Sequence, residues 1–189
     1  MEILTALFGT AAKVKVLRLF LFNGGTAFSV REIAARTKCG SSASKEVNTL
    51  VKADIIRKRH GGKGVTYALN DKFPYLEPLK NLLTVASIKA DESLAKRFAS
   101  AGKVKLIVAA GVFIQNWDSR VDLLIVGDDL NIHKIESVIK VIESEIGKEI
   151  AYSAFETQDF EYRMGIHDRL VRDILDYPHV ALLDRLGVL

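Results

Sequence analysis

The sequence predicts an α+β protein with an N-terminal helical domain, two linker helices and a C-terminal α/β domain. Helical apolar patterns fill the first part of the chain and end in two short β-branched segments around several glycines. Apolar, β-branched runs at 103–110 and 121–126 are followed by an amphipathic helical pattern. Strands that alternate with helices indicate a layered domain. We expect the N-terminal domain to span residues 1–72, the linker helices 73–102 and the C-terminal domain 103–189.

Composition limits the class of protein. Of the 189 residues, 49% are apolar and 26% are charged, as in globular proteins. The single cysteine, Cys39, excludes an intrachain disulfide and fits a reducing compartment. The apolar runs are far shorter than the roughly 20 residues of a membrane helix, and the N-terminus shows no signal-peptide cleavage site. We therefore expect a cytoplasmic protein that contacts no membrane.

Basic residues are concentrated in the first part of the chain. Residues 1–72 contain 13 Lys and Arg against 5 Asp and Glu, a net charge of +8, whereas residues 73–189 carry a net charge of −4. A basic domain joined to an acidic one suggests that a polyanion binds the N-terminal domain alone. A solvated basic surface without a partner is the alternative, and charge does not decide between them.

Three helices are expected before residue 54. The apolar periodicity over residues 4–22 predicts one helix, which ends at Asn23 and the two glycines after it. Ser29 and Glu32 form a capping-box pattern for a short second helix that ends near Thr37.

The third helix is predicted from Gly40 or Ser41 to about Ala53. Its apolar residues recur at i, i+4 and i+7, which places them on one face. The opposite face collects small polar and basic side chains, which suit phosphate and base-edge contacts in a major groove. An ordinary solvated face is the alternative. The apolar residues are Ala43, Val47 and Leu50, and the polar ones are Ser41, Lys45, Asn48 and Lys52, with Thr49 beside them.

A hairpin with a basic tip is expected next. Residues 55–60 and 65–69 have the pattern of two strands, and the glycines between them indicate a turn. A hairpin directly after a helix–turn–helix forms a wing. Glycines let its tip approach a sugar-phosphate backbone, where Arg59, His60 and Lys63 would supply positive charge.

These motifs resemble the winged helix-turn-helix family of prokaryotic transcriptional regulators. The resemblance covers about residues 5–71, and it implies that double-stranded DNA is the partner and that the protein is a homodimer on two-fold half-sites. Such domains also serve RNA binding and protein contacts. Asp54 stands where the family often has glycine, and Asp also tolerates the left-handed conformation. The expected DNA-binding residues are Ser29, Arg31, Ser41, Ser42, Lys45, Asn48, Lys52, Arg57, Arg59, His60 and Lys63.

Two linker helices are predicted over residues 76–90 and 91–101. Pro74 and Pro78 suit the start of the first, and Gly102 suits the end of the second. The leucines of the first helix form an apolar stripe, which is either part of a core or the seam of a dimer.

The C-terminal domain is expected to have the order strand, loop, strand, helix, strand and helix. The strands are predicted over residues 103–110, 121–126 and 149–155, and an amphipathic helix over 131–145. A closing helix is predicted over 159–175.

Residues 104–189 are similar to the nucleotidyltransferase fold of the DNA polymerase beta type, in its minimal prokaryotic form. The similarity is clearest in the segments 121–129, 145–152 and 168–187. In active members a Gly-Ser pair binds the nucleotide phosphates. An Asp-x-Asp pair and a further carboxylate hold the metal ions that flank the transferred phosphoryl group.

The motif is broken in this sequence. Gly111 remains, but Val112 replaces the serine, and Arg120 replaces the first aspartate, so that only Asp122 is left of the pair. A guanidinium at a ligand position repels a divalent ion. Glu149 is the nearest match to the third carboxylate, although a plain strand-end Glu explains it as well. We expect a vestigial nucleotide site of Gly111, Asp122 and Glu149, with no metal or cofactor.

The sequence therefore favours a DNA-binding transcriptional regulator that is not an enzyme. Its C-terminal domain would serve dimerisation or the sensing of a small-molecule or protein effector, whose identity the sequence does not reveal. An active nucleotidyltransferase that modifies a protein or an RNA is one alternative. An antitoxin-like protein-interaction module is the other.

Overall fold

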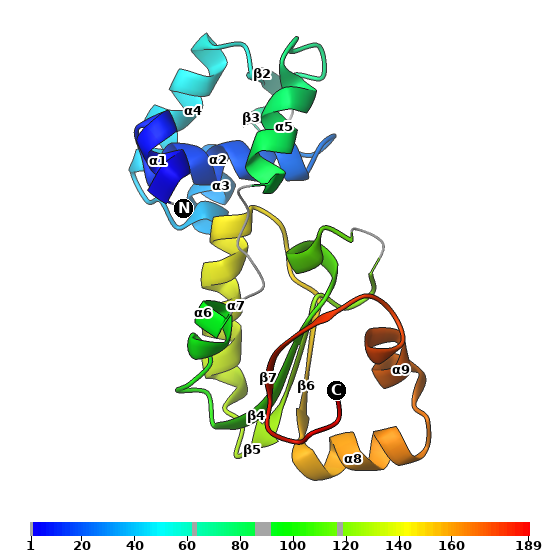
Figure 1. The fold of residues 1–189 in the computed structure, drawn as a ribbon. Coiled ribbons are helices and arrows are strands. Elements are labelled where there is room, and N and C mark those ends of the chain that lie inside the picture. The colour runs from blue at the N-terminus through cyan, green and yellow to red at the C-terminus, as the bar shows by residue number, and fades with distance from the viewer. Residues whose placement is uncertain (1, 62–63, 86–91, 117–118) are drawn as a thin grey trace. The chain divides into compact units, whose positions relative to one another are not determined.

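The computed structural model describes residues 2–61, 64–85, 92–116 and 119–189, and it has a mixed α+β fold with two separate sheets (Figure 1). The predicted α+β class is thus confirmed. The chain forms two compact units. Unit 1 comprises residues 1–88 and 140–149, and unit 2 comprises residues 89–139 and 150–189. No helix in the described part of the chain is both long and apolar enough to cross a membrane.

Unit 1 begins with two helices, α1 (Glu2–Phe8) and α2 (Ala11–Phe22). The prediction of one helix over 4–22 is therefore wrong. Gly9 has φ +88°, a left-handed conformation that costs glycine little, and it interrupts the helical path. Thr10 then caps α2, because its hydroxyl oxygen accepts a hydrogen bond of 3.0 Å from the backbone N–H of Lys13.

The next two helices, α3 (Val30–Thr37) and α4 (Ser42–Lys52), begin and end close to their predicted positions. Ser29 and Glu32 form the predicted capping box at the start of α3. Ser41 precedes α4 but makes no side-chain capping bond. The predicted inner face of α4 is buried in the core of unit 1 and consists of Ala43, Val47 and Leu50.

The sheet of unit 1 has three antiparallel strands in the order β1-β3-β2. They are β1 (Ala27–Phe28), β2 (Ile56–Gly61) and β3 (Gly64–Leu69). The predicted hairpin is thus present as β2 and β3. Only Ile56 of β2 is buried, so the remainder of this strand extends away from the core.

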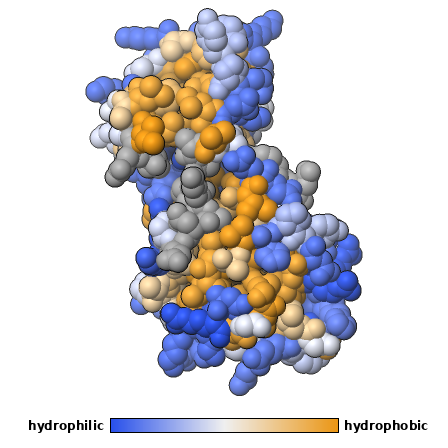
Figure 2. Space-filling view, in the orientation of Figure 1, coloured by the Kyte–Doolittle hydropathy of each residue, from blue (hydrophilic) through white to orange (hydrophobic). Residues whose placement is uncertain are grey.

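Helix α5 (Leu76–Val85) contributes one face to the same core. Leu83 is fully buried, and Leu76 and Leu79 are partly buried against the cluster. The apolar stripe is therefore at least partly core, and its predicted continuation to residue 90 lies outside the described residues. Figure 2 shows apolar side chains on the face of unit 1 that carries α1 and α5. The exposed large apolar residues of these two helices are Ile3, Leu7, Leu82 and Val85.

Residues 140–149 belong to unit 1, where a buried arginine of α2 is hydrogen-bonded to them. Arg18 is 1% exposed, and its Nη1 donates a 2.7 Å hydrogen bond to the carbonyl of Glu145. Its Nη2 donates to the carbonyl of Leu83 at 3.4 Å. Burial lowers the pKa of Arg18, an effect that the charge of Glu145 opposes. Gly147 lies against the Arg18 backbone, where a Cβ would not fit.

Unit 2 contains a four-stranded sheet in the order β6-β5-β4-β7. Strands β4 (Lys103–Ala109), β5 (Leu123–Asp128) and β6 (Tyr152–Glu156) lie near their predicted ranges, and β5 and β6 are parallel. Strand β7 (Val180–Asp184) was not predicted. It pairs antiparallel with β4.

The helices of unit 2 depart from prediction in two places. The expected closing helix is two helices, α8 (Thr157–Gly165) and α9 (Arg169–Leu175). They are separated at His167, which has φ +55°, and Asp168 caps α9 by accepting from two backbone N–H groups. Helix α6 (Glu92–Lys96) is also shorter than predicted, and i→i+3 turns continue from it to Ala101.

Helices α8 and α9 cover one face of the sheet. Phe160 of α8 and Val171 and Ile174 of α9 are buried against Leu106 and Leu124 of the two central strands. Helix α7 (Ile132–Ile146) coincides with the predicted amphipathic helix, and the division between the units falls within it.

Candidate nucleic-acid interface

The exposed face of α4 carries the polar and basic side chains predicted to contact DNA. Ser41, Ser42, Lys45, Asn48 and Lys52 are all exposed. Within the described part of the chain, the side chains of Lys45, Asn48 and Lys52 have no hydrogen-bond or ion-pair partner. Two ammonium groups and one amide are therefore available to bind an external acceptor. Lysine commonly contacts phosphates, and asparagine commonly contacts base edges.

A buried carboxylate fixes the orientation of α4. Glu46 is 3% exposed, and its Oε1 accepts a 2.8 Å hydrogen bond from the Thr10 hydroxyl. Its Oε2 lies 3.9 Å from Lys13 Nζ. These contacts place a negative charge at the start of α2, where the helix dipole favours it. They tie the inner face of α4 to α2, and so the outer face points to solvent.

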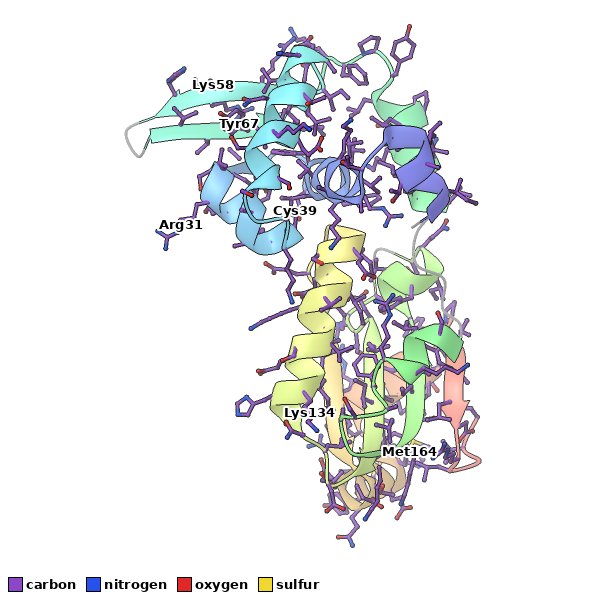
Figure 3. The ribbon with its side chains drawn as sticks, turned by 90° about the vertical axis from the view of Figure 1, so that its left-hand side faces the viewer. Arg31, Cys39, Lys58, Tyr67, Lys134 and Met164 are labelled. Atoms are coloured by element: carbon purple, nitrogen blue, oxygen red, sulfur yellow. The ribbon has the colours of Figure 1, made fainter. Side chains whose placement is uncertain are left out.

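The β2–β3 hairpin provides a second basic surface. Arg57, Lys58, Arg59 and His60 are exposed along β2. Because side chains alternate along a strand, Lys58 and His60 share one face of the hairpin and Arg57 and Arg59 share the other. Lys58 points away from the hairpin in Figure 3 and was missed as a candidate, although it belongs to the same basic run. Lys63 lies outside the described residues.

Arg57 is partly engaged within the chain. Its Nε lies 3.2 Å from Asp54 Oδ1 and its Nη2 lies 3.2 Å from Asp54 Oδ2, in a bidentate ion pair on the surface. The hydrogen bonds from Arg57 hold the pKa of Asp54 below its ordinary value. Asp54 has φ +56°, the left-handed conformation that was predicted for it. Arg57 is thus a weaker candidate for a phosphate contact than Arg59.

Of the two predicted DNA-binding residues near α3, Ser29 is engaged within the chain and Arg31 is not. The N–H and hydroxyl of Ser29 both donate to Glu32 Oε2 at 2.7 Å, and the hydroxyl oxygen accepts from the Glu32 N–H. The hydrogen bonds from Ser29 lower the pKa of Glu32. The Ser29 hydroxyl therefore serves the helix cap. Arg31 is exposed, extends away from α3 (Figure 3), and has no partner among the described residues.

In unit 2, Gly111 and Asp122, two residues of the predicted vestigial site, lie together. Asp122 is 9% exposed; its Oδ1 accepts a 2.8 Å hydrogen bond from the Val112 N–H, and its Oδ2 accepts a 2.9 Å bond from the Ala151 N–H. Gly111 has φ +50°, and a Cβ there would overlap the Asp122 carboxylate. The carboxylate thus joins the turn after β4 to the segment before β6.

Arg120 and Glu149, two further positions of the predicted motif, form ion pairs of their own. Arg120 Nη1 lies 3.1 Å from Asp173 Oδ2, in an exposed ion pair of unit 2. Glu149 belongs to unit 1, where it pairs with Arg36. Within unit 2 the structure brings Gly111 and Asp122 together. No group of three His, Cys, Asp or Glu within the described ranges could hold a metal ion.

The chain was also compared with protein-family models, with curated proteins and with solved structures, and none of these matches it.

Proposed function

We propose that the chain is a DNA-binding transcriptional regulator in which the helices and hairpin of unit 1 act as a winged helix. Helix α4 would enter the major groove, and the β2–β3 hairpin would contact the adjacent backbone. The observation that carries this proposal is the set of exposed cations on α4 and β2 that have no partner in the described part of the chain. These are Lys45, Lys52, Lys58 and Arg59.

The physical reason is counterion release. A cation without a carboxylate partner keeps its charge available, and each phosphate that it neutralises releases a condensed counterion from the duplex. An ion-paired cation would first have to give up its partner. The arrangement on α4 and β2 therefore favours a polyanion over a neutral or cationic protein partner.

The test measures DNA affinity by fluorescence anisotropy at several salt concentrations. Replacing both Lys45 and Arg59 with alanine should weaken binding by about tenfold or more, and it should lower the salt slope by about 2, because each phosphate contact contributes roughly 0.9. The matched control is Arg172→Ala, which removes an exposed cation from unit 2 that is paired with Asp176 at 3.1 Å. Equal affinity of the double variant and the unchanged chain would refute the proposal.

We further propose that unit 2 performs no nucleotidyl transfer. Both oxygens of Asp122 already accept backbone hydrogen bonds, and Arg120 occupies the position of a second carboxylate. Incubation with labelled nucleoside triphosphates and Mg²⁺ should give no transfer above background. Transfer that is lost in Asp122→Asn would establish the enzymatic alternative instead. The homodimer stays a prediction. Light scattering on the full chain would test it by measuring the oligomeric state.

A further inference from the structure

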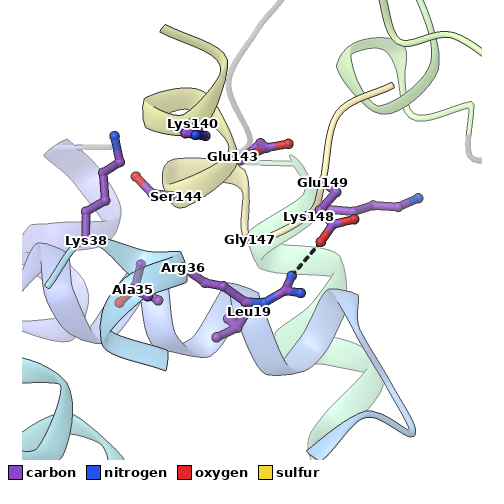
Figure 4. A pocket seen from close by; sticks show the side chains of 11 residues that line it. Leu19, Ala35, Arg36, Lys38, Lys140, Glu143, Ser144, Gly147, Lys148 and Glu149 are labelled. Carbon is purple, nitrogen blue, oxygen red and sulfur yellow. Dashed lines mark ion pairs between the residues drawn. The ribbon is translucent and has the colours of Figure 1, made fainter. Parts of the chain in front are cut away.

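A cavity of about 330 Å³ opens in unit 1 between the end of α3 and the last turns of α7 (Figure 4). Leu19 and Ala35 supply its apolar lining. Lys38 and Lys140 border it from α3's C-terminal side and from α7, and Arg36 extends across it toward Glu149. Its volume lies at the lower end of the range of small-molecule sites, roughly 300–1,000 Å³.

The lining of the cavity carries an excess of two positive charges. Four cationic residues contribute to it against two carboxylates. The cations are Arg36, Lys38, Lys140 and Lys148, and the carboxylates are Glu143 and Glu149. Within the described ranges, Lys38 and Lys140 have no ion-pair partner. The local charge therefore matches a ligand group with two negative charges.

Arg36 is held in place but has a partner that is easily replaced. Its Nη1 lies 3.0 Å from Glu149 Oε1, and the two side chains are 42% and 76% exposed. Exposed ion pairs of this kind contribute little to stability. The guanidinium also lies over the Phe28 ring, 5.4 Å from its centroid, and this contact orients it without using its N–H donors.

We infer that this cavity binds a small molecule bearing a phosphate monoester, which replaces Glu149 as the partner of Arg36. A phosphate offers three acceptor oxygens to the planar guanidinium, in bidentate geometry, and carries nearly two negative charges at neutral pH. The ammonium groups of Lys38 and Lys140 supply the remaining positive charge. The body of the ligand contacts Leu19 and Ala35, and Glu149 turns to solvent.

The test is isothermal titration of the full chain at constant ionic strength with inorganic phosphate, with glycerol phosphate, and with glycerol as the uncharged comparison. Arg36→Gln should weaken phosphate binding about tenfold, because the charge-assisted bonds are lost. Glu149→Gln should tighten it severalfold, because a competing carboxylate is removed. A residue that only supports the fold would not produce these opposite changes.

The matched control is Lys72→Gln, which removes an exposed cation of unit 1 outside both the cavity and the proposed DNA surface and should leave phosphate binding unchanged. Phosphate binding that is absent, that survives Arg36→Gln, or that is lost in Lys72→Gln overturns the inference. The outcome is independent of the proposed function, since a chain that binds phosphate through Arg36 need not bind DNA. The reverse result, DNA binding without phosphate binding, removes only this inference.

Discussion

Four cations of α4 and β2 in unit 1, Lys45, Lys52, Lys58 and Arg59, differ from several cations of unit 2 in what surrounds them. In unit 2, Lys103 Nζ lies 2.9 Å from Asp129, and Lys105 Nζ lies 2.8 Å from Asp128. Arg163 lies 3.0 Å from Asp159. On α4 and β2 of unit 1, Lys45 and Arg59 are exposed and meet no carboxylate among the described residues.

This difference is more informative than the charge count. A set of paired charges produces little field at a distance, because opposite charges close together cancel and salt screens the remainder. Unpaired cations on one surface repel one another and raise the local potential, which disfavours the folded state slightly and attracts polyanions. The basic surface of α4 and β2 thus carries unpaired cations, whereas Lys103, Lys105 and Arg163 of unit 2 are each paired with a carboxylate.

The largest expected effect concerns Asp122, a buried aspartate of unit 2 whose two carboxylate oxygens each accept a backbone hydrogen bond. Asp122→Ala leaves the backbone N–H groups of Val112 and Ala151 without their acceptor. Each lost hydrogen bond to a charged group costs about 1.5–3 kcal/mol, so we expect the free energy of unfolding to fall by about 3 kcal/mol or more. Urea denaturation measures this loss.

The control for Asp122 is Asp173→Ala, which breaks the exposed pair with Arg120. Its cost should stay below about 1 kcal/mol, as for other surface ion pairs. Equal stability of Asp122→Ala and the unchanged chain would mean that the carboxylate has no structural role. It would then have to be reconsidered as a functional group, and the contrast between the units would weaken.

The next effect is an increase in DNA affinity. In Asp54→Asn the carboxylate that engages Arg57 is removed, while Asn retains the tolerance for the left-handed conformation at this position. Arg57 then becomes an unpaired cation like Arg59. We expect DNA binding to tighten about threefold and the salt slope to rise by up to about 1, which is one more phosphate contact.

Fluorescence anisotropy with the same duplex measures this change. The companion variant Asp71→Asn removes one exposed negative charge from unit 1 without touching Arg57. An equal gain in both variants would show that net charge, rather than the release of Arg57, determines affinity.

The elements of unit 1 that carry local signals were predictable. The cap of α3 depends on Ser29 and Glu32, three residues apart, and the end of α4 depends on residues up to Asp54. These contacts join residues that are close together in the sequence. The predicted capping box, inner face of α4 and hairpin therefore agree with the structure. The break at Gly9 also had a local signal, the Gly-Thr pair, which the strong apolar periodicity outweighed.

The features that depend on distant residues were not predictable. Strand β7 exists because β4 offers it a free edge, and its own short apolar run does not distinguish strand from helix. Residues 140–149 contact unit 1 through distant side chains, among them Asn23 and the buried Arg18, which looks like a surface cation in the sequence. The engagement of Arg57 by Asp54 is likewise a matter of side-chain geometry.

The smallest expected effect tests whether the paired charges of unit 2 are truly coupled. Hydrogen bonds from Lys105 and then from Thr157 hold the pKa of Asp128 below its ordinary value of 3.8. A carboxyl group whose pKa is lower in the folded chain stabilises the fold at pH values above its pKa in the unfolded chain. This stabilisation is lost as the pH falls through the pKa of the folded chain. Lys105→Gln should therefore raise the pKa of Asp128 and lower the melting temperature at neutral pH. The difference should vanish at acid pH, once Asp128 is protonated in both states.

Carboxyl-detected NMR titration of Asp128 measures the pKa directly, and thermal melts at several pH values follow the stability. Lys103→Gln is the matched control, because Lys103 pairs with Asp129 and affects Asp128 only through its more distant charge. Lys105→Gln should shift the pKa of Asp128 more than Lys103→Gln does. Equal shifts would mean that the surface of unit 2 acts through its summed charge rather than through defined pairs. Its cations would then be as available as those of α4, and ion pairing would no longer distinguish the two units.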